Sequence, residues 1–198
     1  MSLVSLLKKI IHERGYPLSM SIEEYKWLHR IARDAEPPFL EVGTHYGVSA
    51  LIMHTANPTA PIYTVDNLID YGGDKPGAMP SDCGILVKNI EQVHLRIGDS
   101  KQVVPKLVEE HSFGLALLDG SHWKEDVLAD LKNTENIPVV LIHDAGAGGP
   151  LDALEIFQSL DIIHQQFEML PAAKTDLPFD IDVNGLAIID RRNKHDRF

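Results

Sequence analysis

The sequence predicts an α/β fold: a doubly wound, mostly parallel sheet of seven strands with helices on both faces, preceded by a helical extension. Short apolar runs separated by helix-like segments follow from about residue 38 onward, and these runs lack the polar alternation of half-exposed strands, as expected for strands buried on both faces. Polar residues and glycines gather just after these runs, where such sheets bind ligands. We therefore expect one Rossmann-like domain over residues 1–198, with helices in residues 1–36 and the sheet in residues 38–192.

The composition is that of an ordinary globular domain with an acidic balance. The chain has 198 residues, of which 44% are hydrophobic and 24% charged, which is enough to bury a core without cross-links. Its one cysteine, Cys83, excludes an internal disulfide and a cysteine-rich zinc cluster. The net charge of −11 repels phosphate backbones and anionic lipid, so we expect neither nucleic acid nor a membrane as partner. No apolar run approaches membrane-spanning length and no signal-peptide pattern is visible, so we expect a cytoplasmic protein.

Two helices are expected ahead of the sheet. Apolar residues recur at helical spacing between Leu3 and Ile11, and the segment Gly15–Pro17 interrupts the pattern. Ser21 and Glu24 form a capping-box pattern at the start of the second helix, which Pro37-Pro38 ends. The apolar face of the first helix is a surface on which a second copy could dock, so a homodimer is one open expectation.

The remaining elements alternate along the chain. Strands are expected at Phe39–Val42, Ile62–Val65, Val93–Ile97, Leu115–Leu118, Val139–Ile142, Phe167–Leu170 and Leu186–Ile189. Helices are expected through Val48–Ile52, over Asp82–Gln92 and Lys101–Glu110, through Val127–Leu131, and from Gly149-Pro150 onward. Glycine, aspartate and proline make the segments Asn67–Pro80 and Gly146–Gly149 candidates for mobile loops.

The turn after the first strand, Glu41-Val-Gly-Thr-His-Tyr-Gly-Val-Ser49, has the features of a ligand site. Gly43 and Gly47 allow a tight turn and a close approach to a ligand. A dinucleotide site would carry a third glycine, and Glu41 suits an amine-bearing ligand better than a pyrophosphate. Asp66 ends the second strand, where an acid can bind ribose hydroxyls, and Asp99 follows the third, where it can receive an exocyclic amine. Taken singly, each aspartate would serve equally well as a helix cap.

This pattern resembles class I S-adenosylmethionine-dependent methyltransferases, over about Pro38 to Ile189. The resemblance implies that the glycine turn cradles the amino-acid part of the cofactor, that Asp66 holds the ribose, and that Asp99 with Ser100 lies near the adenine. His45 would line the cofactor or face solvent. The implied cofactor-binding residues are Glu41, Gly43, Thr44, His45, Gly47, Ser49, Asp66, Asn67, Asp99, Ser100 and Asp119.

The next two strands end in groups suited to acid–base or metal chemistry. The fourth strand runs into Asp119-Gly-Ser-His122-Trp123 and the fifth into His143-Asp144. Neighbouring strand ends lie about 5 Å apart, so Asp119 and Asp144 can share a cation through their oxygens. His122 can take a proton from an acceptor hydroxyl, since an unperturbed imidazole is half charged near about pH 6.5.

The Asp-Gly-Ser-His turn resembles that of small-molecule O-methyltransferases of the macrocin type and of relatives of the cephalosporin-hydroxylase type, and the catechol O-methyltransferase group is similar in layout. The resemblance implies a divalent metal, usually magnesium, on Asp119 and Asp144, with His122 as the base. This chain departs from the pattern at His143, where the relatives usually carry a second oxygen ligand. Imidazole is a poor ligand for magnesium and a good one for zinc, iron or nickel. Three possibilities stay open. Magnesium or zinc could be held by Asp119, His143 and Asp144, His143 could have another role, or no metal could be bound.

The sequence thus predicts an enzyme that moves a methyl group from S-adenosylmethionine to a hydroxyl of a small-molecule acceptor, and it does not name the acceptor. The alternatives are an NAD(P)-dependent oxidoreductase, disfavoured by the missing third glycine, and a non-catalytic S-adenosylmethionine-binding regulatory subunit, which His143 keeps open. A metal-assisted hydrolase is a more distant alternative. Trp27 is expected in the core, and Trp123 is expected either to wall the acceptor pocket or to pack.

Overall fold

The structure of the chain is a computed structural model that describes residues 3–14, 18–68, 80–146, 148–159, 168–170 and 185–192. Most of the expected loop Asn67–Pro80, one residue of the glycine-rich stretch Gly146–Gly149, and Phe167 lie outside these ranges. Within the described ranges, no helix combines the length and the apolar character that crossing a membrane requires.

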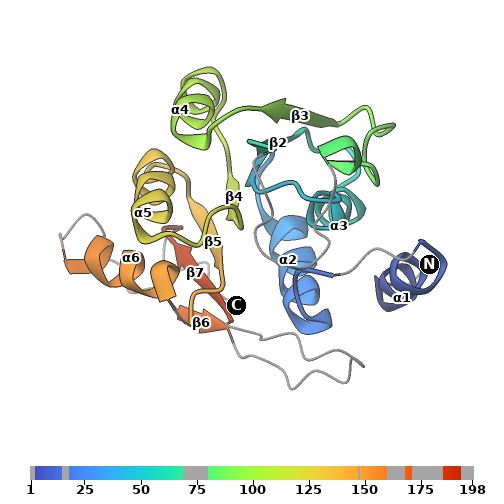
Figure 1. Cartoon of the computed structure of the whole chain (residues 1–198), viewed down its shortest axis with the longest axis horizontal. Helices are drawn as coiled ribbons and strands as arrows, with labels where there is room; N and C mark the ends of the chain where they lie inside the picture. Colours follow the sequence, from blue (N-terminus) through green and yellow to red (C-terminus); the bar gives the residue numbers. More distant parts are fainter. Residues whose placement is uncertain are drawn as a thin grey trace.

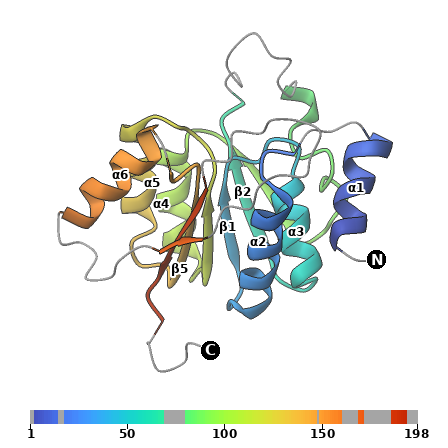
Figure 2. The same ribbon diagram turned by 90° about the horizontal axis from the view of Figure 1, so that it is seen from below.

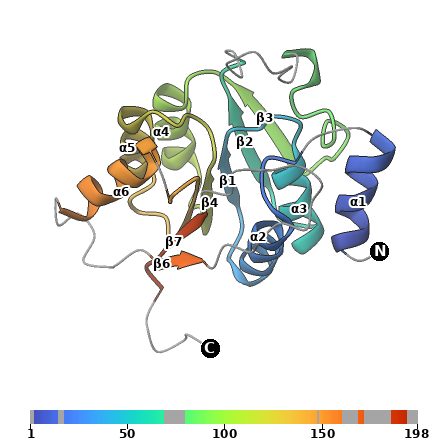
Figure 3. The same cartoon turned by 60° about the horizontal axis from the view of Figure 1, so that its bottom comes forward.

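One mostly parallel sheet forms the centre of the molecule (Figure 1). Its strands are β1 (Phe39–Val42), β2 (Ile62–Asp66), β3 (Val93–Ile97), β4 (Leu115–Leu118), β5 (Val139–His143), β6 (Glu168–Leu170) and β7 (Leu186–Asp190). The spatial order is β3-β2-β1-β4-β5-β7-β6. β1 to β5 pair in parallel, whereas β7 runs antiparallel to both β5 and β6. β3 forms one edge, and β6 beside β7 forms the other (Figure 3). The predicted Rossmann-like α/β fold is confirmed.

Helices cover both faces of this sheet (Figure 2). One face carries α1 (Leu3–Arg14), α2 (Ile22–Asp34) and α3 (Val48–Ala56), and the other carries α4 (Ser100–Glu110), α5 (Lys124–Asn133) and α6 (Gly148–Ser159). Strand side chains alternate between two apolar cores, so that Phe39 belongs to the first and Leu40 to the second. Because both faces are covered, every residue of β1, β4 and β5 is buried, which explains why the sequence shows no polar alternation there.

The capping box predicted for α2 is confirmed. The backbone N–H of Ser21 donates to Glu24 Oε2 at 2.7 Å, and the N–H of Glu24 donates to Ser21 Oγ at 3.2 Å. Trp27 on the same helix is only partly buried, with the Arg30 guanidinium 5.6 Å from its ring centroid. It packs at the margin of the core, so the expectation of a core tryptophan is met only in part.

The helix predicted over Asp82–Gln92 is wrong. A short 3₁₀ helix, η1 (Pro80–Asp82), is followed by turns over residues 83–89. Gly84 adopts φ +65°, and its N–H donates to the carbonyl of His45 at 2.8 Å, while the N–H of Leu86 donates to Tyr46 at 3.1 Å. These amides therefore bind the turn after β1 and do not form helical bonds. The apolar pattern that suggested a helix arises because Leu86 and Val87 are buried in the first core.

Candidate functional site

The candidate site lies at the carboxyl ends of β1 and β4, where the order of the strands reverses. The chain passes from β1 to β2 and β3 on one side, then continues with β4 and β5 on the other. Open α/β sheets bind their ligands in the crevice at such a reversal. The acids and histidines predicted from the sequence gather at these ends and at the neighbouring ends of β2 and β5: Glu41, Asp66, Asp119, His122, His143 and Asp144.

Gly43 lies tightly against the backbone at the end of β4. Its φ is +94°, and a Cβ at this position would lie 2.1 Å from the carbonyl oxygen of Asp119. The N–H of Asp119 donates to Val42 at 2.8 Å, and the N–H of Gly43 donates to Val65 at 2.9 Å. Both the positive φ and the contact exclude a side chain. The sequence predicted a close approach to a ligand, and the structure shows a close approach to the chain's own backbone.

Asp66 holds the turn after β1 in shape. Its Oδ2 accepts hydrogen bonds from the backbone N–H groups of Thr44, at 3.0 Å, and His45, at 3.1 Å. Its Oδ1 accepts from the N–H of Leu68 at 2.9 Å. The bonds to Thr44 and His45 help to fix a turn in which His45 has φ +48°. A ribose at this acid would have to share or replace these backbone bonds.

Glu41 is a fully buried carboxyl group with one unused oxygen. Its Oε2 accepts from the hydroxyl of Thr64, which lies 2.6 Å from the hydroxyl of Thr44, whereas its Oε1 has no hydrogen-bond partner. Burial raises the pKa of Glu41 to about 8, and the charges of Asp119 and Asp66 add to the rise, against the hydrogen bonds of Ser49 and Thr64. The group therefore stays protonated near neutral pH unless a cation lies beside it.

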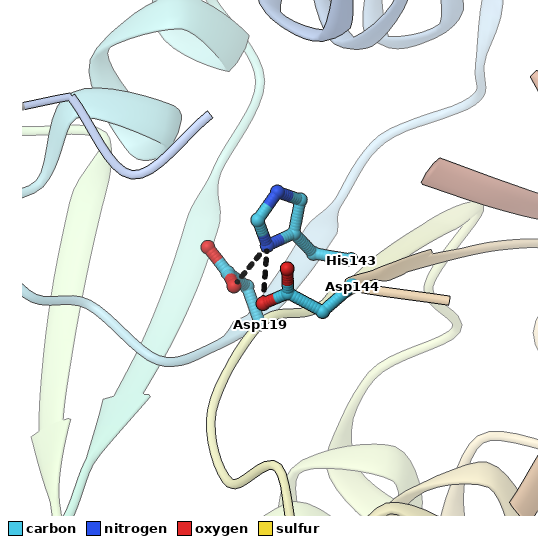
Figure 4. Close-up of side chains that lie close together, drawn as sticks. All are labelled: Asp119, His143 and Asp144. Carbon is cyan, nitrogen blue, oxygen red and sulfur yellow. Dashed lines mark ion pairs between the residues drawn. The ribbon is translucent and has the colours of Figure 1, made fainter. Parts of the chain in front are cut away.

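His143 lies between two carboxylates, and the three side chains point toward one another (Figure 4). Its Nδ1 is 2.9 Å from Asp119 Oδ1 and 3.1 Å from Asp144 Oδ2. The ring is 6% exposed, yet Nδ1 makes no hydrogen bond of normal geometry. One donor atom from each residue lies within 4.8 Å of the other two. The structure thus brings the three predicted metal ligands together.

Charge within this cluster is strongly coupled. Burial opposes a charge on His143, but the nearby carboxylates of Asp119, Asp144 and Glu24 outweigh it and raise its pKa well above the usual value. Burial also acts to raise the pKa of Asp144, but its contacts with the rings of His122 and His143 prevail and lower it. The cluster therefore keeps carboxylate charge available at the strand ends.

His122 lies at the outer side of the cluster. Its Nε2 is 2.9 Å from Asp144 Oδ2, and its side chain is 64% exposed. The hydrogen bond to Asp144 raises the pKa of His122 and outweighs the effect of partial burial. The neighbouring carboxylate therefore stabilises the charged ring.

Three of the predicted residues lie at the margins of this arrangement. Asp99 is exposed at the N-cap of α4, where its Oδ1 accepts from the N–H of Lys101 at 3.0 Å, which is the cap role that the sequence left open. Asn67 is exposed just beyond Asp66. Trp123, beside His122, is 76% exposed. The packing alternative for Trp123 is therefore wrong.

Glu24 belongs to the cluster although the sequence indicated only its capping role. Its side chain is 3% exposed, and its Oε1 lies 3.7 Å from Nε2 of His143. The capping-box pattern of Ser21 and Glu24 is the sequence signal at this position. That pattern does not show which strand end the carboxylate of Glu24 faces. That placement depends on how α2 packs on the sheet.

Comparisons with known proteins identify the family and the fold of this chain. Residues 40–145 match a family model described as a methyltransferase domain. A comparison with curated proteins gives no match.

Solved structures share the fold at low sequence identity. A putative caffeoyl-CoA O-methyltransferase from Staphylococcus aureus is 12% identical with a TM-score of 0.65, over 95% of this chain and 91% of that chain. An O-methyltransferase from Bacillus cereus in complex with SAH is 15% identical with a TM-score of 0.64, over 95% and 90%. CalS11, a calicheamicin methyltransferase, is 18% identical with a TM-score of 0.59, over 86% and 78%.

Proposed function

This chain belongs to the methyltransferase-domain family, and from that premise we propose that it transfers the methyl group of S-adenosylmethionine to a hydroxyl of a small molecule. One observation carries the proposal: the glycine turn after β1 packs directly on Asp119, with a hypothetical Cβ of Gly43 only 2.1 Å from the Asp119 carbonyl. A turn of the cofactor-binding type and a cluster of acids and histidines therefore meet at the carboxyl ends of the central strands. Alignment of two reactants and deprotonation of one are what methyl transfer needs from a protein.

We assign the cofactor to the turn and the acids that follow β1, β2 and β3. When bound, S-adenosylmethionine supplies an electrophilic methyl carbon on a sulfonium sulfur. Glu41 Oε1, buried and without a partner, suits an ammonium group. Asp66 and Asn67 suit the ribose, and Asp99 with Ser100 the adenine. The backbone of the turn supplies the rest of the cradle, through Gly43, Thr44, His45, Gly47 and Ser49.

We assign the base to His122. Its Nε2 faces Asp144 at 2.9 Å, so an N–H there donates to the carboxylate and leaves Nδ1 as the proton acceptor. Asp144 thereby orients the ring and stabilises the imidazolium that forms when the acceptor hydroxyl gives up its proton. The exposed Trp123 stands next to this base and offers a flat apolar surface for an acceptor.

A divalent cation fits the group of Asp119, His143 and Asp144. Nδ1 of His143 is buried and makes no hydrogen bond of normal geometry, and the three donor atoms lie within 4.8 Å of one another, which supports a site for one ion. Two carboxylates with an imidazole favour zinc, iron or nickel over magnesium. Bound there, the ion would act as a Lewis acid that lowers the cost of forming an alkoxide or phenolate.

A methyl-transfer assay with labelled S-adenosylmethionine tests the enzymatic role. Sugars, catechols and other hydroxyl compounds would be offered as acceptors, with zinc, iron or magnesium added in turn. We expect labelled product, and we expect His122→Ala to lower kcat by about 100- to 10,000-fold without weakening cofactor binding. His94→Ala, which removes a histidine from the edge strand β3, is the matched control and should retain activity.

Two results would contradict parts of this proposal. Cofactor binding without transfer to any acceptor would favour the non-catalytic subunit. Full activity of His122→Ala would remove the base from this position. The family assignment gives no support to the NAD(P)-dependent oxidoreductase.

A further inference from the structure

We infer that Glu24 is a positioning residue of the candidate metal centre: its carboxylate receives the Nε2 proton of His143 and so leaves Nδ1 of that ring free to bind a divalent cation between Asp119 and Asp144. The inference rests on the proposed metal-assisted function. It adds to the site a residue of α2, which lies outside the stretch 40–145 that matches the family model.

The two nitrogens of His143 face different partners. Nδ1 points at the carboxylates of Asp119 and Asp144, and the second nitrogen points away from both (Figure 4). That second nitrogen, Nε2, lies 3.7 Å from Glu24 Oε1. A shift of a few tenths of an ångström would bring this pair to hydrogen-bond distance.

Two of the three atoms that the inference uses are buried and lack a hydrogen bond in the structure. They are Glu24 Oε1 and His143 Nδ1, on side chains that are 3% and 6% exposed. A buried carboxylate oxygen without a donor is costly, and so is a buried ring nitrogen that lies between two carboxylates without a suitable bond. A proton on Nε2 and a cation at Nδ1 would satisfy both atoms at once.

The capping box fixes the direction of the Glu24 side chain. Its Oε2 accepts from the Ser21 N–H at 2.7 Å while Ser21 Oγ accepts from the Glu24 N–H at 3.2 Å. With one oxygen held at the start of α2, the other is directed at the end of β5. The same residue thus begins a helix and supports a strand-end histidine.

A histidine that binds a metal through one nitrogen commonly donates its other N–H to a carboxylate. The partner fixes the tautomer and the orientation of the ring, and its removal typically weakens metal binding by about 10- to 100-fold. The competing explanation is a purely structural ion pair, in which a charged His143 is shared by the surrounding carboxylates and no cation binds.

Cobalt(II) titration of the full chain, followed by visible absorption, separates these explanations. The test variant is Glu24→Gln, because glutamine is also accepted at this place in a capping box. Its amide oxygen can keep the Ser21 bond, but its NH₂ group cannot accept the proton of His143. We expect cobalt to bind the unmodified chain and to bind Glu24→Gln about 10- to 100-fold more weakly, with an altered absorption spectrum.

Two control variants exclude simpler causes. Glu23→Gln removes the same charge from the same helical turn, at an exposed residue paired with Lys26, and should leave cobalt affinity unchanged. Ser21→Ala weakens the cap without removing the carboxylate that faces His143, and should also leave it unchanged.

Equal cobalt affinity of Glu24→Gln and Glu23→Gln would overturn the inference. So would an equal loss in Ser21→Ala, or no cobalt binding by the unmodified chain. S-adenosylhomocysteine binding, measured on the same samples, keeps this outcome separate from the proposed function. If it persists while the cobalt result fails, the methyltransferase proposal stands and the role of Glu24 does not.

Discussion

Single residues at the site keep polar atoms that the protein itself does not satisfy. Glu24 Oε1, Glu41 Oε1 and His143 Nδ1 are buried without a hydrogen bond, and each such atom typically costs about 1–3 kcal/mol. Groups of this kind normally find a partner when the fold forms. Their concentration around the ends of β1 and β5 is what we expect if a ligand amine and a cation complete the site.

Glu41 gives the clearest consequence for stability. Its pKa is about 8 in the folded protein against an ordinary value of 4.5, so the folded state keeps a proton that the unfolded state releases. Its contribution to stability is complete below about pH 4.5 and is lost as the pH rises through about 8, by up to about 1.4 kcal/mol per pH unit. Glu41→Gln has no such loss. Its thermal unfolding midpoint should exceed that of the unmodified chain by a margin that grows between about pH 5 and pH 8.

The control for this experiment is Glu23→Gln, at an exposed position on α2. Its unfolding midpoint should follow that of the unmodified chain at each pH. If Glu41→Gln also runs parallel to the unmodified chain, Glu41 is ionised in the folded protein and the assignment of its proton is wrong. If Glu41 also holds the cofactor amine, the more stable variant will bind S-adenosylhomocysteine more weakly.

The sequence predicted which residues gather at the strand ends better than it predicted their contacts. It placed Asp119, His143 and Asp144 in one site, because parallel strand ends meet at one edge. It could not decide between two roles for Asp99, since an aspartate before a helix suits both a cap and a ligand; the structure shows the cap. It did not place Glu24 in the site, because the packing of α2 on β5 joins residues more than a hundred positions apart.

At the scale of elements, the site depends on how the ends of β1 and β4 are joined. Gly43 lies against the backbone of Asp119, and the segment after η1 adds bonds from Gly84 and Leu86 to the same turn. The ends of β1 and β4, the turn after β1 and the segment after η1 are therefore held together by backbone contacts. A disturbance at Gly43 should reach both the cofactor end and the acid–histidine end of the site.

Gly43→Ala should be strongly destabilising. The new methyl group would lie 2.1 Å from the Asp119 carbonyl oxygen, at a φ of +94°, and we expect a loss of about 3 kcal/mol or more. Gly148→Ala is the matched control, because its φ is +59° but nothing lies within 4 Å of the added carbon; it should cost about 1 kcal/mol. Urea unfolding of both variants measures the difference. Similar losses in the two would show that the contact with β4 contributes little.

Element positions were predictable where burial alone decides them. β1 and β4 have the bounds expected from the sequence, Phe39–Val42 and Leu115–Leu118, because strands covered on both faces are largely apolar. The segment Asp82–Gln92 shows the limit of that reasoning. Its apolar spacing suits a helix, but bonds to His45 and Tyr46 compete with helical bonds, and tertiary partners of this kind leave no local signature.

At the scale of the whole molecule, the strand order places the site. The strand order reverses between β1 and β4, which is where open α/β sheets bind their ligands, and the glycine turn and the group of Asp119, His143 and Asp144 follow strands at this place. The two groups of helices flank it on opposite faces (Figure 2). The fold thus brings a cofactor-type turn from the first half of the chain beside candidate catalytic groups from the second.

The most direct test of this account is calorimetric titration of the unmodified chain with S-adenosylmethionine and S-adenosylhomocysteine. Asp66→Ala removes the carboxylate that Thr44 and His45 bind, and Asp34→Ala removes an exposed aspartate at the end of α2 as its control. We predict binding of both compounds in the micromolar range by the unmodified chain and by Asp34→Ala, and none by Asp66→Ala in a protein that remains folded. Failure of the unmodified chain to bind either compound, or undiminished binding by Asp66→Ala, would contradict the cofactor site described above.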